Sequence, residues 1–183
     1  CKRDSNGWDD IFKSEDSRTR IIQLAGLSPD VWRLATEFIL WDLYAFASAG
    51  GDKNSPLPVV LDEVQNLDHR LESPVGKMLT EGRKYGLSLI LATQTLSNLR
   101  KDEQDRLFQA SHKLFFAPAE TEIKKYAEIL EVTVKNSKRQ DWIDVLSALK
   151  KGQCLSVGYH LNGSNLELSV KKVHVMSLEN RLC

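Results

Sequence analysis

The chain has 183 residues, of which 42% are hydrophobic, and its 25 basic and 25 acidic side chains give a formal net charge of zero. This size and composition predict one ordinary soluble domain with a sizeable core. The balanced charge excludes a global electrostatic attraction to nucleic acid, so any attraction to DNA must come from local patches.

Cysteines and apolar runs limit the setting. The 3 cysteines form no Cys-x-x-Cys pair, which argues against a zinc site or a disulfide framework and favours a reducing, cytoplasmic environment. There is no signal peptide and no unbroken run of 18 apolar residues, so we expect no membrane insertion.

The N-terminal third predicts a polar entry segment over residues 1–19, followed by a first strand over residues 20–25. Ser28, Pro29 and Asp30 are typical of a helix start, and Gly50-Gly51 of its end. Apolar residues recur at helical spacing between these points, and we expect them to face the core. They are Val31, Leu34, Phe38, Trp41, Ala45 and Ala49.

Two apolar runs then end abruptly in polar side chains. Residues 57–61 run into Asp62-Glu63, and residues 87–91 lead through Ala92-Thr93 into Gln94. Runs of Val, Leu and Ile without polar alternation favour strands buried on both faces of a parallel sheet. The carboxyl ends of such strands meet at one edge, where ligands bind in open α/β sheets.

The polar ends have complementary chemistry. Two adjacent carboxylates are costly to hold together without a cation, and oxygen ligands suit Mg²⁺, so Asp62 is a candidate metal ligand. Glu63 could then orient and polarise an attacking water, and Gln94 could hydrogen-bond a phosphate oxygen or that water. The alternative is that Asp62 and Glu63 only begin a solvated loop. The strand context and Gln94 favour phosphoryl transfer.

Between the two runs we expect a loop over residues 64–73 and a helix over residues 74–85 that leads through Gly86. His69 has no second ligand-type residue at metal spacing apart from the acids already assigned, so we expect it at the surface. Arg83, near the end of this helix, could stabilise charge on a neighbouring subunit's nucleotide. It could equally serve only the helix terminus.

The C-terminal half predicts a strand over residues 112–116, helices over residues 121–130 and 141–149, and a closing β-hairpin. In the hairpin, alternating apolar residues 155–161 face residues 166–170 across a turn-rich link. Glu122-Ile123-Lys124 has the Glu-x-Lys form of some nucleases, but its helical position argues against that role.

Residues 58–99 carry a family resemblance. Val60-Leu61-Asp62-Glu63 resembles a Walker B strand, and residues 81–86, Glu-Gly-Arg-Lys-Tyr-Gly, are followed by the strand ending Ala92-Thr93-Gln94. Together they are similar to the HerA/FtsK superfamily of P-loop ATPases, and most to its HerA branch. The resemblance extends more loosely over residues 20–175. It implies a RecA-like α/β three-layer sandwich with a mostly parallel sheet, of which residues 20–183 would form the C-terminal portion.

No phosphate-binding Gly-x-x-x-x-Gly-Lys-Ser/Thr loop occurs in the 183 residues. We therefore expect Walker A to be supplied from upstream, and this portion alone to hydrolyse little ATP. In the family the Walker A strand lies between the strand ending at Gln94 and the strand at residues 112–116. We expect these two strands either to close up or to have another element between them.

Basic residues also depart from the family pattern. HerA-like chains tend to carry an arginine just after the strand that here ends at Phe116, whereas this chain continues with Ala117-Pro118. Arg83, Arg100 or Arg106 could substitute, or hydrolysis could be slow or absent. Arg100-Lys101, just beyond Gln94, is the basic pair best positioned to meet DNA.

The resemblance implies a hexameric motor that uses ATP and Mg²⁺ and acts on duplex DNA with other subunits of a DNA-processing complex. The chain as a whole is also similar to the helicase-like component of phosphorothioation-dependent restriction in bacterial defence. One alternative is an inactive ATPase-like module for oligomerisation or DNA docking. Another is a fragment of a type IV secretion or conjugation ATPase.

Overall fold

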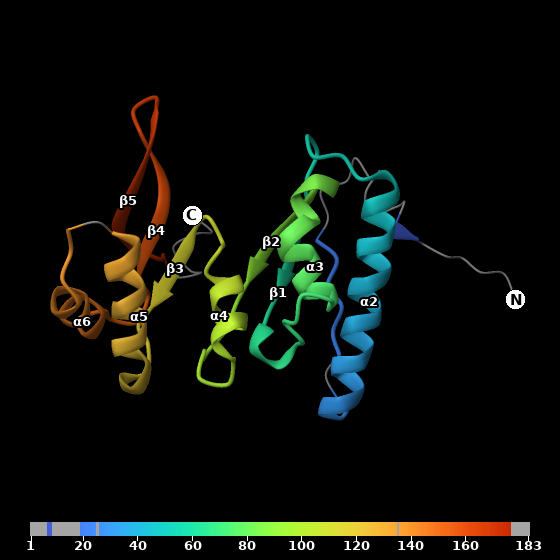
Figure 1. The fold of residues 1–183 in the computed structure, drawn as a ribbon, viewed down its shortest axis with the longest axis horizontal. Helices are drawn as coiled ribbons and strands as arrows, with labels where there is room; N and C mark the ends of the chain where they lie inside the picture. Colours follow the sequence, from blue (N-terminus) through green and yellow to red (C-terminus); the bar gives the residue numbers. More distant parts are fainter. Residues whose placement is uncertain (1–6, 9–18, 25, 135, 177–183) are drawn as a thin grey trace, which may run out of the picture. The chain divides into compact units, whose positions relative to one another are not determined.

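The computed structural model describes residues 7–8, 19–24, 26–134 and 136–176 (Figure 1). It divides into two compact units, which are described separately. The first unit contains residues 1–94 and 101–106, and the second contains residues 95–100 and 107–183. Most of the expected polar entry segment at residues 1–19 lies outside the described residues.

The first unit is built on a parallel pair of strands. Its strands β1 (Leu57–Leu61) and β2 (Leu87–Leu91) pair in register from Leu57↔Leu87 to Leu61↔Leu91. Its helical elements are α2 (Pro29–Gly50), η1 (Val64–Asn66), α3 (Pro74–Glu81), η2 (Gly82–Tyr85) and α4 (Lys101–Leu107). The two predicted strands and the predicted helix over residues 74–85, which changes to a 3₁₀ turn at Gly82, are confirmed.

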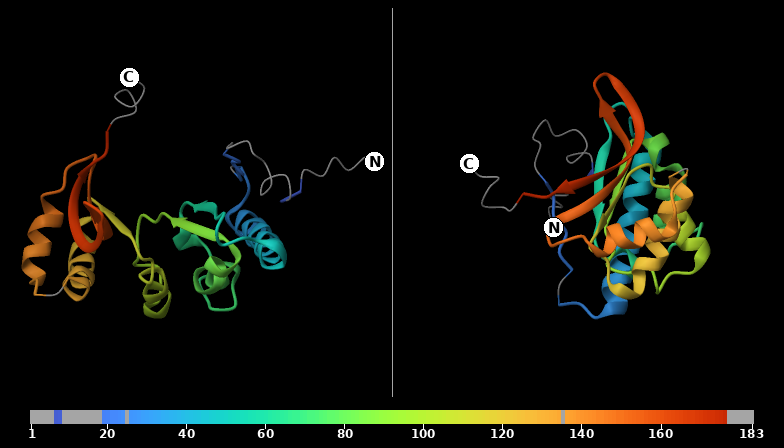
Figure 2. Two further views of the ribbon diagram at one scale, coloured as in Figure 1. Left: turned by 90° about the horizontal axis from the view of Figure 1, so that it is seen from above. Right: turned by 90° about the vertical axis from the view of Figure 1, so that its left-hand side faces the viewer.

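Helices α2 and α3 lie on the same side of the β1–β2 pair (Figure 2). Their buried side chains and the helix-facing leucines of the strands form one apolar core. The opposite face of the strands leaves Val60 65% and Ile90 55% exposed. The expectation that both strands are buried on two faces is therefore wrong, because no described element covers this second face. The described part of the unit has two layers, not three.

Helix α2 spans the predicted residues but has the opposite orientation. Its buried residues are Leu40, Leu43 and Ala47. The stripe predicted to face the core points away from it, and Phe38 is 66% exposed. The prediction was wrong because α2 is apolar on two opposite faces, and spacing alone does not distinguish which of them meets the sheet.

The second unit contains the antiparallel sheet β3-β4-β5, formed by β3 (Lys113–Phe116), β4 (Gln153–Asn162) and β5 (Asn165–His174). Helices α5 (Glu120–Thr133) and α6 (Arg139–Ser147) pack on it. Its core combines Phe115, Leu155 and Val157 with helical residues such as Leu130 and Leu146. The predicted hairpin is confirmed, since β4 and β5 pair up to Asn162↔Asn165.

Two expectations about the sheet are wrong in the described residues. Residues 19–24 form no strand. The strands are not mostly parallel, because β3, β4 and β5 all pair antiparallel. Among the described strands, β1 and β2 pair only with each other and β3 pairs only with β4, and the expectation about the space between β2 and β3 stays a prediction. The α/β class and the hairpin are present, and the described strand pairs form a two-stranded sheet in the first unit and a three-stranded sheet in the second.

The entry into β2 depends on Gly86, which has a left-handed backbone with φ of 73°. A Cβ atom there would lie 2.3 Å from the Asp52 carbonyl oxygen. The Gly86 carbonyl accepts a 2.7 Å hydrogen bond from the Leu57 N–H, which aligns the starts of β1 and β2.

Among the described helices, none is both long enough and apolar enough to cross a bilayer.

Candidate functional site

The parallel pairing of β1 and β2 brings their polar ends together. Beyond the last strand pair, the Ala92 N–H donates to the Leu61 carbonyl at 2.9 Å, and the Val64 N–H donates to the Ala92 carbonyl at 3.0 Å. These two bonds hold the Asp62-Glu63 turn beside the segment that leads to Gln94. Both acids and the amide therefore lie at one edge of the strand pair, as the sequence predicts.

The Glu63 carboxylate is held by two amide side chains. Gln94 Nε2 donates to Oε1 of Glu63, and Gln65 Nε2 donates to Oε2. Gln65 is fixed in turn, because its Oε1 accepts a 2.7 Å hydrogen bond from Thr93 Oγ1. Two residues that follow β2 therefore hold Glu63 in place. Gln94 bonds its carboxylate directly, and Thr93 acts through Gln65.

The backbone of Glu63 is left-handed, with φ of 53°. This region is uncommon for a residue with a side chain and persists only where the surroundings enforce it. Here the Glu63 N–H donates to Asp62 Oδ1 at 2.9 Å, and the 3₁₀ turn η1 begins immediately afterwards. The unusual backbone turns the Glu63 side chain toward the end of β2 and leaves Asp62 exposed.

Asp62 offers a limited metal site. One of its carboxylate oxygens accepts the Glu63 N–H, and the side chain is solvent-exposed. Within the described residues no group of three or more His, Cys, Asp or Glu side chains could hold an ion. This donor set fits Mg²⁺ only in the manner of nucleotide sites, where one or two carboxylates are supplemented by phosphate oxygens and water.

The structure does not bring the predicted Arg83 to this edge. Arg83 lies in η2, before the start of β2, whereas Gln94 follows its end. At about 3.3 Å per residue, the five-residue strand β2 separates them by more than about 16 Å. Arg83 is exposed, so a role toward a neighbouring subunit stays a prediction.

The remaining basic candidates differ in their surroundings. Arg100 and Lys101 are both exposed, and Lys101 begins α4. Arg106 is instead engaged within its own unit. Its Nε donates to the His69 carbonyl at 2.8 Å, and its terminal nitrogen pairs with Asp102 at 2.7 Å. Arg106 thus supports the loop after Glu63.

His69 is buried, with no exposed surface, so its predicted surface position is wrong. Its Nε2 lies 2.6 Å from the Val64 carbonyl oxygen. Since a carbonyl only accepts, Nε2 carries the proton, and the buried Nδ1 has no partner. The ring fills the space under the loop over residues 64–73, a tertiary role that its polar sequence neighbours do not indicate.

Glu122 is a buried residue that sequence reasoning did not assign to this region. Its carboxylate accepts hydrogen bonds from Thr95 Oγ1 at 2.7 Å, from the Leu96 N–H at 3.2 Å and from Ser97 Oγ. Burial alone would raise the pKa of Glu122, but the bonds from Ser97, Thr95 and Leu96, with the charge of Lys125, hold the pKa at about 2. Glu122 therefore fixes, as an ion, the segment that directly follows Gln94.

Gln65 and Thr93 were also missed. Both are neutral, and each lies within two residues of a polar residue that the sequence analysis had already singled out. Their positions in the sequence could have identified them. Gln65 follows Glu63 by two residues, and Thr93 immediately precedes Gln94, so each stands near the end of one of the two paired strands. Polar residues at two neighbouring strand ends are therefore candidates to bond each other.

Comparison with known proteins gives a structural relationship only. No protein family and no curated protein matches the sequence. A solved structure, "Structure of the genome packaging NTPase B204 from Sulfolobus turreted icosahedral virus 2 in complex with AMPPCP", matches with a TM-score of 0.52 at 16% identity. The match covers 77% of this chain and 62% of that chain. The fold of this chain is similar to that of this genome packaging NTPase. The chain spans less than two thirds of this neighbour.

Proposed function

We propose that these residues form the C-terminal part of an ATP-driven DNA translocase of the HerA/FtsK type. The supporting observation is the Glu63 carboxylate at the carboxyl ends of two parallel strands, held by the amide of Gln94 from the adjacent strand end. A carboxylate beside an amide at this edge suits the orientation of an attacking water in phosphoryl transfer.

In this proposal each residue has a separate task. Asp62 binds Mg²⁺ through water or directly, together with the phosphates of ATP. Glu63 orients the water, and Gln94 bonds either that water or the terminal phosphate. The phosphate-binding loop comes from residues upstream of this chain. Arg83 serves the nucleotide of a neighbouring subunit in a hexamer.

Duplex DNA is the proposed substrate of the motor, and bacterial DNA processing or restriction in the cytoplasm is its proposed setting. Arg100 and Lys101 are the proposed DNA contacts, because both are exposed and follow the Gln94 segment. Phosphate contacts give salt-dependent binding. Replacing both residues by alanine should weaken DNA binding and reduce the dependence of the binding constant on salt concentration. Unchanged affinity and salt dependence would remove these residues from the interface.

The decisive experiment measures Mg²⁺-dependent ATP turnover in a polypeptide that joins these residues to their upstream sequence. Glu63→Gln should reduce turnover at least a hundredfold while nucleotide binding persists, because the amide keeps the shape but cannot polarise water. Glu72→Gln is the matched control, since Glu72 lies in the following loop and is exposed. Turnover that survives Glu63→Gln would overturn the assignment.

A second candidate is an inactive ATPase-like module for oligomerisation or DNA docking. Two observations favour it: both Glu63 oxygens already accept amide hydrogen bonds, and Arg106 is occupied by His69 and Asp102. The module predicts nucleotide-independent assembly and no turnover in the extended polypeptide. The same assay therefore separates the two candidates.

A further inference from the structure

The outward face of α2 carries a seam of large apolar side chains that no described element covers. Val31 is 50% exposed, Leu34 56%, Phe38 66% and Trp41 39%. The four residues, here called the α2 seam, lie opposite the buried residues Leu40, Leu43 and Ala47. Contiguous exposed apolar surface of this kind marks an interaction site.

The spacing of the α2 seam is that of helix-to-helix packing. Val31, Leu34, Phe38 and Trp41 follow one another at intervals of three, four and three residues, the a and d positions of a heptad repeat. Two apolar residues per heptad form the narrow stripe that another helix packs against. The seam therefore fits a helical partner better than a strand.

Charges beside the α2 seam are acidic. With Val31 at position a, Asp30 and Glu37 occupy g positions and Asp42 an e position. Asp42 is oriented by a 2.5 Å hydrogen bond from the indole nitrogen of Trp8. The basic residue of this helix, Arg33, falls at position c, away from the seam. Since e and g residues select the partner, the seam favours basic flanks.

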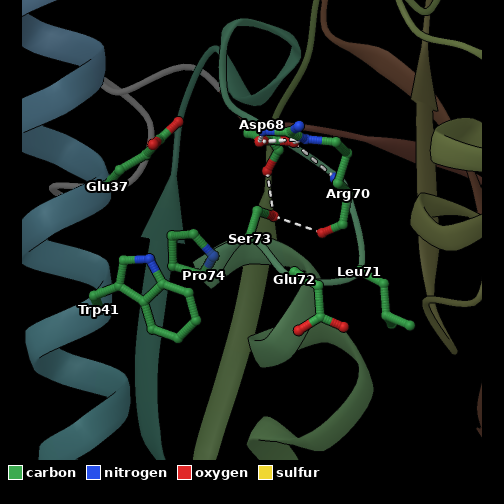
Figure 3. Close-up of a pocket in the computed structure, with 8 residues that line it drawn as sticks. All are labelled: Glu37, Trp41, Asp68, Arg70, Leu71, Glu72, Ser73 and Pro74. Carbon is green, nitrogen blue, oxygen red and sulfur yellow. Dashed lines mark hydrogen bonds and ion pairs between the residues drawn. The ribbon is translucent and has the colours of Figure 1, made fainter.

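A cavity adjoins the seam at Trp41. It has a volume of about 390 Å³ and lies between α2 and the loop before α3. Figure 3 shows Glu37 and Trp41 on the helix side, facing Pro74 and the loop. Leu71, which is 50% exposed, adds to its apolar lining.

The charge inside the cavity is also negative. Arg70 is neutralised by Asp68, since its Nε donates to Asp68 Oδ2 at 2.8 Å, and this bond lowers the pKa of Asp68. Glu37 has no ion-pair partner among the described residues. A cation placed over the Trp41 ring would gain from the ring and from Glu37 together. The cavity thus suits the long side chain of a lysine or arginine.

We propose that the α2 seam is the docking site for an amphipathic helix of another polypeptide, with apolar a and d residues and lysine or arginine at e and g. One basic side chain of that helix enters the cavity beside Trp41 and Glu37. Pairing with a second copy of α2 is disfavoured in both directions. Parallel helices would oppose Glu37 and Asp42, and antiparallel helices would oppose Glu37 to Glu37. An anionic membrane surface would also be repelled by this acidic border.

The test uses two designed peptides with leucine at a and d, one with lysine and the other with glutamate at every e and g position. Like charges keep each peptide from pairing with itself. Fluorescence anisotropy measures binding of each labelled peptide to the 183-residue chain. We expect the lysine peptide to bind at least about tenfold more tightly than the glutamate peptide. Equal affinity, or no binding of the lysine peptide, overturns the proposal.

Variants locate the binding. Leu34→Ala combined with Phe38→Ala should weaken the lysine peptide about tenfold or more. Asp30→Lys combined with Glu37→Lys should reverse the preference between the peptides. Val132, which is 82% exposed on α5, provides the control Val132→Ala, which should leave binding unchanged. Circular dichroism verifies that each variant is folded.

Two further measurements distinguish a basic helix from two other possible partners of the α2 seam, a second copy of the chain and a membrane. Sedimentation of the chain that shows a dimer dissociated by the Leu34 and Phe38 substitutions would assign the seam to a second copy. Binding to phosphatidylserine vesicles that is lost in the same variant would assign it to a membrane. Either result overturns the proposal. Neither depends on ATP turnover, so this site stands or falls separately from the proposed motor function.

Discussion

The carboxylate of Glu122, in the first turn of α5, accepts a 3.2 Å hydrogen bond from the backbone N–H of Leu96, 26 residues earlier. Leu96 lies two residues beyond Gln94 in the chain. The charge of Glu122 therefore stabilises the conformation of residues 95–97, which follow the candidate amide in the chain, and its contribution can be tested through the pH dependence of stability.

Glu122 should stabilise the fold in a defined pH range. Its pKa of about 2 in the folded chain lies below the ordinary value of 4.5, so its contribution is complete above pH 4.5 and is lost as the pH falls toward 2. Glu122→Gln should lower the free energy of unfolding by roughly 2–3 kcal/mol at neutral pH. Urea titrations measure the free energy of unfolding of both chains. The difference in this free energy between the variant and the unmodified chain should become smaller near pH 2.

Glu120→Gln provides the matched control for Glu122, because Glu120 lies in the same helical turn but is exposed. It should leave the pH dependence nearly unchanged. A constant difference between the Glu122→Gln variant and the unmodified chain from pH 7 to pH 2 would show that shape, rather than charge, explains the role of Glu122.

The orientation of α2 can be tested by replacing a leucine on its buried face and a leucine on its exposed face, each by alanine. Leu40 is 3% exposed and Leu34 is 56% exposed. Leu40→Ala should cost about 2–5 kcal/mol because it leaves a cavity. Leu34→Ala should stay within about 0.5 kcal/mol. Denaturant unfolding measures both, and the reverse order would restore the orientation expected from the sequence.

His69 should contribute to stability through its ring volume and its bond to Val64. His69→Ala leaves a cavity and removes the side-chain bond to the Val64 carbonyl, which keeps its 3.1 Å bond from the Leu67 N–H, and should lower the free energy of unfolding by about 2–4 kcal/mol. Asn66→Ala, at an exposed position in the same loop, should have little effect. Thermal unfolding followed by circular dichroism distinguishes them, and equal transition temperatures would contradict the buried position.

Replacing Gly86 by alanine should cost stability in two ways, through backbone strain at its positive φ and through a steric clash. Gly163 allows the two contributions to be separated. Gly163 also has a positive φ, of 63°, but a Cβ there meets nothing within 4 Å. Gly163→Ala should cost about 1 kcal/mol from backbone strain alone. Gly86→Ala adds a clash with the Asp52 carbonyl and should cost clearly more. Equal losses in chemical denaturation would show that the loop at Asp52 moves freely.

Local patterns predicted the elements better than their environments. The runs ending at Leu61 and Leu91 identified both parallel strands, and turn residues 162–165 placed the hairpin, because these signals are short-range. The orientation of α2 was not predictable from spacing, since both of its faces are apolar. The burial of His69 depends on Val64 and Arg106, and the residues beside His69 in sequence do not reveal either contact.

The candidate site, like the fold, was only partly predictable from the sequence. The meeting of Glu63 and Gln94 follows from parallel pairing of two strands that end in polar residues. The second amide, Gln65, was missed because its contribution depends on the left-handed backbone at Glu63, which no sequence rule anticipates for glutamate. Glu122 was missed because its three donors lie on a loop 25 to 27 residues earlier.

The double amide grip on Glu63 has a consequence for a motor of the proposed kind. Each Glu63 oxygen that accepts one amide hydrogen bond keeps a second acceptor direction, so the two amides fix the directions from which a water molecule can bind. In such a motor, an arriving nucleotide that draws Gln94 or Gln65 away from Glu63 would change where the carboxylate binds water, and so would couple nucleotide arrival to water placement.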